Sequence, residues 1–286
     1  MEHDNVFQMS ASNIRFGGGC TAEVGMDVRQ LSAKRTMVLV DPNLRTLPIF
    51  EVVVDSLKRQ NLCYEVFDEI AVEPTDSSFQ LAAEAATEGG FDCFLAVGGG
   101  STIDTAKAAN LYATHPQHFF HYVNAPIGEG QPVPGPLKPL IAVPTTAGTG
   151  SETTGVAIFD FVEQKAKTGI AHRDLKPTLG IIDPDNPRTL PAAVAASSGL
   201  DVLSHALESF TAMPYNQRPR PETPLHRPAY QGSNPISDLW AIHALELMAE
   251  YLPRAFDDPA DDEARGNMML AAAIAGIGFG NAGVHL

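Results

Sequence analysis

The chain has 286 residues, 44% of them hydrophobic, so it is long enough for one large domain or two ordinary ones with apolar cores. Its 34 acidic residues outnumber its 19 basic residues and give a net charge of −15, which argues against nucleic acid or an anionic membrane as a partner. Three widely spaced cysteines favour reduced thiols. No apolar run reaches transmembrane length, and residues 1–4 do not resemble a signal or transit peptide, so we expect a cytoplasmic protein, or a mitochondrial matrix protein if a transit peptide is missing.

The first 183 residues are predicted to alternate between strands and helices. Short, almost entirely apolar strands indicate a sheet that is buried on both faces. The expected strands are 12–19 (running into a glycine turn), 36–41, 64–67, 93–97, 140–143, 154–161 and 178–183, and the expected helices are 21–31, 49–60, 77–88 and 102–112. This alternation is typical of a parallel, doubly wound sheet, which binds ligands at the carboxyl ends of its strands.

The composition changes near Pro184–Pro187. No clear strand follows, and residues 192–213, 236–256 and 260–280 read as helices rich in alanine and leucine. We therefore predict an α/β nucleotide-binding domain over 1–187 and an all-α domain over 188–286. A proline-rich loop over 214–234 separates the first two helices and is too long for a plain connection.

The glycine loop, Gly98-Gly99-Gly100-Ser101, follows an apolar strand and precedes a predicted helix. Glycines allow close backbone approach, and a helix N-terminus offers free N–H donors, so this loop suits a phosphate group. It matches neither the G-x-G-x-x-G nor the Walker pattern, and a plain glycine turn is the alternative. Asp104, in the first turn of the helix, is placed to accept hydrogen bonds from the loop's own backbone.

A second polar loop follows the strand at 140–143. It carries four hydroxyl groups, which suit a diphosphate or a ribose, on Thr145, Thr146, Thr149 and Ser151. Asp41, at the end of an earlier strand, is placed to accept a ribose hydroxyl, which would favour NAD over its phosphorylated form. The alternative for Asp41 is an Asx turn before the following proline.

Asp201 and His205 lie four residues apart on a predicted helix and therefore point the same way. A carboxylate and an imidazole at this spacing can bind one divalent metal, Fe²⁺ or Zn²⁺. Two ligands do not hold a catalytic metal, so an ion pair on the helix face is the alternative. Three further histidines, His115, His118 and His121, follow the end of another predicted helix, where a polar loop is favoured over a metal cluster.

Three motifs together resemble the iron-containing (group III) alcohol dehydrogenases: residues 96–107, 144–152 and 199–208. The resemblance implies an N-terminal nucleotide-binding domain and a C-terminal helical domain with the site in the cleft between them. It implies that Asp201 and His205 are the first two ligands of a divalent metal, usually Fe²⁺. It also implies NAD(H) contacts at Asp41, Gly98, Gly99, Gly100, Ser101, Asp104, Thr145, Thr146, Thr149, Ser151 and Lys167.

The implied reaction is hydride transfer through NAD(H) between a hydroxyacid or alcohol and an oxoacid or aldehyde, in a full-length protein that is a homo-oligomer. Stretches such as 227–238 and 276–285 resemble members that pass hydride from 4-hydroxybutyrate to 2-oxoglutarate. Such acids need a cationic side chain that binds their carboxylate. We hypothesise that this side chain is Arg218, Arg220 or Arg227, because arginine binds a carboxylate through two hydrogen bonds. The alternatives are a plain alcohol or diol dehydrogenase, a lyase of the dehydroquinate synthase type, and a nucleotide-binding fragment without catalysis.

The chain departs from the family pattern at its C-terminal end. Family members supply two more histidines, in a His-Gly-Met and a Pro-His-Gly segment, and neither segment occurs here. His285 falls just before the first of these positions. We therefore expect an incomplete helical domain in which residues 260–286 expose apolar surface.

Overall fold

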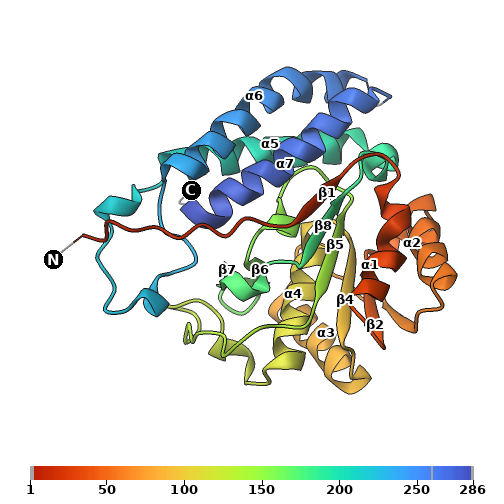
Figure 1. Ribbon diagram of the computed structural model, residues 1–286, viewed down its shortest axis with the longest axis horizontal. Coiled ribbons are helices and arrows are strands. Elements are labelled where there is room, and N and C mark those ends of the chain that lie inside the picture. The colour runs from red at the N-terminus through yellow and green to blue at the C-terminus, as the bar shows by residue number, and fades with distance from the viewer. Residues whose placement is uncertain (1–2, 259, 285–286) are drawn as a thin grey trace.

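The computed structural model describes residues 3–258 and 260–284, with the backbone alone at Leu225. Six parallel strands form one sheet in the order β1-β8-β5-β4-β2-β3, seen in the centre of Figure 1. These strands are β1 (Ile14–Phe16), β2 (Thr36–Val40), β3 (Tyr64–Phe67), β4 (Cys93–Gly98), β5 (Leu140–Pro144) and β8 (Leu179–Ile182). Each coincides with a predicted strand to within a few residues, so the parallel α/β fold expected from the sequence is confirmed.

Helices cover both faces of this sheet. Val38 and Val40 of β2 pack with α1 (Val24–Gln30) and α2 (Pro48–Arg59) on one face. The alternate residues of the same strand, Met37 and Leu39, pack on the other face with the helices α3 (Asp76–Gly89) and α4 (Gly100–Thr114). Burial on both faces is the reason why the strand sequence is apolar without alternation.

The direction of winding reverses between the neighbouring strands β2 and β4. The helix after β2 covers one face, and the helix after β4 covers the other. A crevice therefore opens at the carboxyl ends of these two strands, which is where such sheets bind ligands. Asp41 and the glycine loop both lie there, and the Asp41 amide donates a hydrogen bond to the Val97 carbonyl (3.3 Å).

The strand expected over 154–161 does not join the parallel sheet. It is β6 (Val156–Phe161), and it pairs antiparallel with β7 (Ala166–Ala171), a strand that the sequence did not predict. The sequence of β7 is Ala-Lys-Thr-Gly-Ile-Ala, which is too polar to stand out as a buried strand. The hairpin buries Phe159 and Phe161 against α3, α4 and the following loop.

Three long helices form the second half of the chain, in the upper part of Figure 1: α5 (Ala192–Thr211), α6 (Pro235–Asp257) and α7 (Asp262–Ala282). The last strand ends at Ile182, and the domain boundary near residue 187 stays a prediction. No helix in the described ranges is long and apolar enough to cross a membrane.

The expectation that residues 260–286 expose apolar surface is wrong for the part that is described. From Met268 to Ala282 almost every residue of α7 is buried. The helix carries small and apolar residues on all of its faces, and α5 and α6 pack against it. His285 lies outside the described residues. In residues 260–284 the one exposed large apolar side chain is Val284. Most of the exposed apolar side chains of the helical half lie on α5 and α6 and include Leu200, Leu207, Phe210, Ile236, Leu239 and Ile242.

Candidate active site

The glycine loop packs directly on the threonine loop (residues 145–151). A Cβ atom at Gly99 would lie 3.1 Å from Thr146 Oγ1, and one at Gly100 would lie 2.6 Å from Thr149 Cγ2. Helix α4 begins at Gly100, and Gly99 at its N-cap offers no side-chain hydrogen bond to the first turn. The first backbone N–H groups of α4 are thus left for a ligand, and the absence of side chains lets a phosphate come close.

A buried lysine ties this site together. The fully buried Lys107 ammonium donates hydrogen bonds to Asp104 Oδ1 (3.1 Å), Ser151 Oγ (2.6 Å) and the Val156 carbonyl (2.6 Å). Asp104 accepts further bonds from Ser151 Oγ and the Ile158 amide. The expectation that Asp104 binds its own loop is therefore wrong: it joins α4 to the threonine loop and to β6. Burial lowers the pKa of Lys107, and the Asp104 carboxylate opposes that shift.

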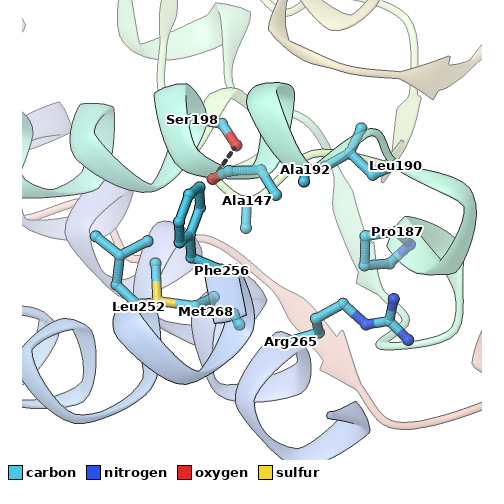
Figure 2. Close-up of a pocket in the computed structure, with 11 residues that line it drawn as sticks. Ala147, Pro187, Leu190, Ala192, Ser198, Leu252, Phe256, Arg265 and Met268 are labelled. Carbon is cyan, nitrogen blue, oxygen red and sulfur yellow. Dashed lines mark hydrogen bonds between the residues drawn. The ribbon is translucent and has the colours of Figure 1, made fainter. Parts of the chain in front are cut away.

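The helical half holds the threonine loop from the other side. Thr153, two residues beyond this loop, donates a hydrogen bond from its Oγ1 to the Ala273 carbonyl of α7 (3.1 Å). Gly276 allows this approach, because a Cβ at that position would lie 2.2 Å from Thr153 Oγ1. Figure 2 shows Ala147 of the same loop at an apolar pocket lined by Leu252 and Phe256 of α6, among others. None of the predicted site residues lines this pocket. The apolar side chains around it pack the two halves of the chain against each other.

The predicted metal ligands, Asp201 and His205, lie one turn apart on α5. His205 Nε2 is 3.7 Å from Asp201 Oδ1. Metal–ligand bonds of about 2.0–2.2 Å place two tetrahedral ligand atoms about 3.4 Å apart, so this pair fits one ion with little movement. Burial raises the pKa of the Asp201 carboxyl, and His205 counteracts that effect.

The His205 ring is held in place by packing, but one of its two nitrogen atoms lacks a hydrogen-bond partner in the described part of the chain. It stacks on Phe279 with 4.2 Å between the ring centroids. Its Nδ1 is buried and has no hydrogen-bond partner within the described part of the chain. Nε2 is the ring nitrogen that faces Asp201, so it is the atom that can join a metal shared with that carboxylate. Within the described residues, however, no third histidine, cysteine or carboxylate completes a close group with this pair.

One cleft brings the predicted cofactor residues to the predicted metal ligands. It is bordered by α4, the threonine loop, the β6–β7 hairpin, α5 and α7, and its lining includes Gly100, Ser101, Asp104, Thr149, Ser151, Lys167, Asp201 and His205. Segments from both halves of the chain thus meet at one place, and Gly100 and Phe279, which both line the cleft, are about 180 residues apart in sequence. This agrees with a site in a cleft between the two halves.

The other predicted cofactor residues lie beside this cleft at the strand ends and do not line it: Asp41, Gly98, Gly99, Thr145 and Thr146. The Thr145 amide donates to the Gly98 carbonyl (3.1 Å), which joins the two loops. The Asp41 carboxylate accepts from the amide and the side chain of Asn43, so the Asx turn is formed and the ribose contact stays a prediction.

Charged side chains at the cleft differ from the sequence hypothesis. Lys167 is on the wall and pairs with Glu73 and Asp160. No arginine is among the described lining residues. Arg227 instead binds Asp4 through both carboxylate oxygens (2.8 and 3.2 Å).

Several lining residues were missed by the sequence reasoning, and two of them are aromatic. Tyr230 and Phe279 both face the cleft. Burial raises the pKa of the Tyr230 hydroxyl, so it stays a hydrogen-bond donor at neutral pH. Only the fold brings these aromatic residues to Asp201 and His205, and no local motif indicated it.

Comparison with protein families identifies the architecture. A family described as iron-containing alcohol dehydrogenase matches residues 11–184, and the Fe-containing alcohol dehydrogenase family, C-terminal, matches residues 229–286. The chain belongs to the iron-containing alcohol dehydrogenase family. The likeness stated from the three sequence motifs is thereby confirmed.

Curated relatives in this family cover almost the whole chain. The mitochondrial hydroxyacid-oxoacid transhydrogenase of Mus musculus is 60% identical over 285 residues, which is 99% of this chain and 61% of the relative. The protein of the same name from Caenorhabditis elegans is 53% identical over the same shares of the two chains. This chain thus spans about three fifths of the length of these iron-containing alcohol dehydrogenase relatives.

Solved structures of the family have the same fold. A 1,3-propanediol oxidoreductase superposes with a TM-score of 0.84 at 27% identity, covering 98% of this chain and 68% of the other. A sulfoacetaldehyde reductase from Bifidobacterium kashiwanohense, in complex with NAD⁺, has a TM-score of 0.83 at 28% identity and covers 98% of this chain and 69% of the other.

Proposed function

We propose that this chain is the nucleotide- and metal-binding part of an oxidoreductase that transfers hydride through NAD(H), and that it acts as a hydroxyacid-oxoacid transhydrogenase. The observation that carries the proposal is the single cleft that holds Gly100, Ser101 and Thr149 together with Asp201 and His205. The names of the relatives at 60% and 53% identity support the transhydrogenase reaction. We propose 4-hydroxybutyrate as the hydride donor and 2-oxoglutarate as the acceptor.

The residues of the chain divide the task. The N-terminus of α4 and the hydroxyls of the threonine loop bind the diphosphate of NAD(H), and Lys107 keeps the two loops in place from beneath. Asp201 and His205 would hold Fe²⁺ or Zn²⁺, which supplies Lewis-acid polarisation of a substrate hydroxyl. The apolar faces of Phe279 and Ile158 exclude water from the cleft beside them.

Within the described residues, Asp201 and His205 are the only two that are placed to bind the proposed metal. An ion held by one carboxylate and one imidazole is bound weakly, so we expect metal affinity and turnover well below those of the longer relatives. The word "mitochondrial" in the relatives' names supports a matrix location over the cytoplasmic one. Homo-oligomerisation and the lack of nucleic-acid binding stay predictions.

The test measures NADH binding, metal content and isotope transfer separately. The chain is incubated with NAD⁺, Fe²⁺, 2-oxoglutarate and 4-hydroxybutyrate deuterated at C4. We expect deuterium at C2 of 2-hydroxyglutarate, NADH binding by fluorescence, and loss of metal and turnover, but not of NADH binding, in Asp201→Asn and His205→Gln. Ser204→Ala is the matched control, because Ser204 is exposed on the same helix turn.

Three results would redirect the proposal. NADH binding without metal or turnover would make the chain a nucleotide-binding module. Faster oxidation of 1,2-propanediol or ethanol than of 4-hydroxybutyrate would make it a plain dehydrogenase. Turnover that survives both ligand substitutions would remove Asp201 and His205 from the mechanism.

A further inference from the structure

The loop between α4 and β5 contains a second group of metal-ligating side chains. His118 Nε2 lies 3.0 Å from Glu129 Oε1, and His121 Nδ1 lies 3.0 Å from Glu129 Oε2. One ligand atom from each of the three residues lies within 4.8 Å of the others. Two imidazoles and one carboxylate form a ligand set that binds Zn²⁺ in proteins.

The backbone of this loop presents the three side chains on one side. His118 precedes a short 3-10 turn, Phe119–His121, and the His121 amide donates to the His118 carbonyl (3.0 Å). The Glu129 amide donates to the Phe120 carbonyl (2.9 Å), which brings the carboxylate back over the same turn. Main-chain hydrogen bonds therefore bring the backbone of the three residues together, and side-chain torsions set the final positions of the ligand atoms.

Close packing at a glycine closes the loop on itself. A Cβ at Gly128 would lie 2.3 Å from the Val123 carbonyl oxygen, so only glycine fits immediately before Glu129. The Gly130 amide donates to that same carbonyl (2.8 Å). The position of Glu129 is thus enforced from both neighbours along the chain.

Aromatic packing anchors the loop to the body of the protein. The rings of Phe119 and Phe159 lie 5.2 Å apart, and those of Phe120 and Phe161 lie 5.1 Å apart. Phe159 and Phe161 lie on β6 of the β6–β7 hairpin. The neighbouring residue Ile158 faces the opposite side of the hairpin, where it lines the cleft. The loop that carries His118 and His121 therefore packs on the face of the hairpin that is turned away from the cleft, apart from the Asp201 and His205 pair.

The charge around the cluster favours a cation. His118 borders a groove that also contains Glu84 and Glu88 of α3. No lysine or arginine is among the described residues that line this groove. His118 and Glu129 are half-exposed, with 58% and 49% of their side chains accessible, so an ion can reach them from solvent.

We propose that His118, His121 and Glu129 form a binding site for Zn²⁺ that is separate from the metal site in the cleft. Zinc bonds of about 2.0–2.2 Å require ligand atoms about 3.4 Å apart, so the widest pair must close by about 1.4 Å, which torsions of the exposed side chains supply. The ion replaces the His121–Glu129 hydrogen bond and the His118–Glu129 ion pair, and it leaves the fourth position to water. Binding stiffens the loop and, through the aromatic contacts, the hairpin wall of the cleft.

The experiment uses the whole chain with Asp201→Asn and His205→Gln, so that the cleft ligands are removed. Zn²⁺ alone is titrated into the chelator-treated protein by calorimetry in a buffer that does not bind metal. We expect about one Zn²⁺ per chain, and at least tenfold weaker binding when His121→Gln or Glu129→Gln is added. His243→Gln is the control, since His243 is another exposed histidine that pairs with a glutamate, Glu246 (3.4 Å).

A second readout does not depend on further substitutions. The ¹⁵N shifts of the His118 and His121 rings should change on addition of Zn²⁺ while those of His243 stay constant, and amide exchange over 118–131 should slow. No zinc binding, binding that His121→Gln and Glu129→Gln leave intact, or equal shifts at His243 would each overturn the proposal and leave an ordinary hydrogen-bonded cluster. The outcome is independent of whether the chain catalyses hydride transfer.

Discussion

Replacing Glu152 with glutamine should stabilise the protein at neutral pH. Glu152 directly follows the threonine loop and is 3% exposed. Burial raises the pKa of its carboxyl from 4.5 to about 7, and the charge of Lys107 only partly offsets that effect. Between these two values the folded protein holds a proton that the unfolded chain has released. Stability therefore falls as the pH rises from 4.5 to about 7. The difference between a pKa of 4.5 and one of about 7 corresponds to about 3 kcal/mol of stability.

The assay is urea unfolding of the wild type and Glu152→Gln at intervals from pH 4.5 to pH 8. The neutral amide does not titrate, so the two proteins should be similar at pH 4.5, and the variant should be more stable by about 3 kcal/mol at pH 8. Glu163→Gln is the control, because Glu163 is exposed in the hairpin turn and should unfold like the wild type throughout. Parallel curves for wild type and Glu152→Gln would refute the reasoning, since they would mean that Glu152 is charged in the folded protein at no cost.

Three further outcomes are expected. Lys107→Met should lower the free energy of unfolding by about 3–5 kcal/mol in urea, because it leaves the Asp104 carboxylate without its buried partner; a loss under about 1 kcal/mol would show that the lysine is dispensable. Gly100→Ala should weaken NADH binding at least tenfold by fluorescence titration, whereas Gly266→Ala, whose Cβ would lie 3.4 Å from Pro184, should not; equal affinities would contradict close packing of the two loops. Arg227→Ala and Asp4→Asn should each lower the melting temperature in thermal unfolding, and the double variant should lower it by no more than either single variant; additive losses would mean that the two residues do not act as a pair.

Local pattern was sufficient for most of the helices and strands. The strands β2 and β4 are short, continuous apolar runs between turn residues, and that pattern survives because both faces of a parallel sheet are buried. Helix α5 could be placed for the same kind of reason, and with it the shared direction of Asp201 and His205, which depends only on helical periodicity. The order of strands, in contrast, was not determined by any of these runs.

Long-range packing decided what the sequence could not. The polar strand β7 exists because β6 pairs with it, and the burial of α7 follows from its packing against α5, α6 and the segment Ser151–Thr153. Asp104 lies in a helix turn where its own loop is the nearest partner in sequence. Its hydrogen bonds to Ser151 and Ile158 come from segments about fifty residues away, so only the tertiary structure could show them.

The sequence alone thus determined the secondary structure of the α/β half except for β7, and the two polar loops, because periodicity and glycine placement act over a few residues. It also indicated the spacing of Asp201 and His205. The tertiary structure decided that these residues share one cleft, that Arg227 binds Asp4 and lies apart from that cleft, and that His118, His121 and Glu129 meet in one loop. Each of these depends on which distant segments pack together. The free energy of that packing is a sum over the whole core, so no local stretch of sequence determines it.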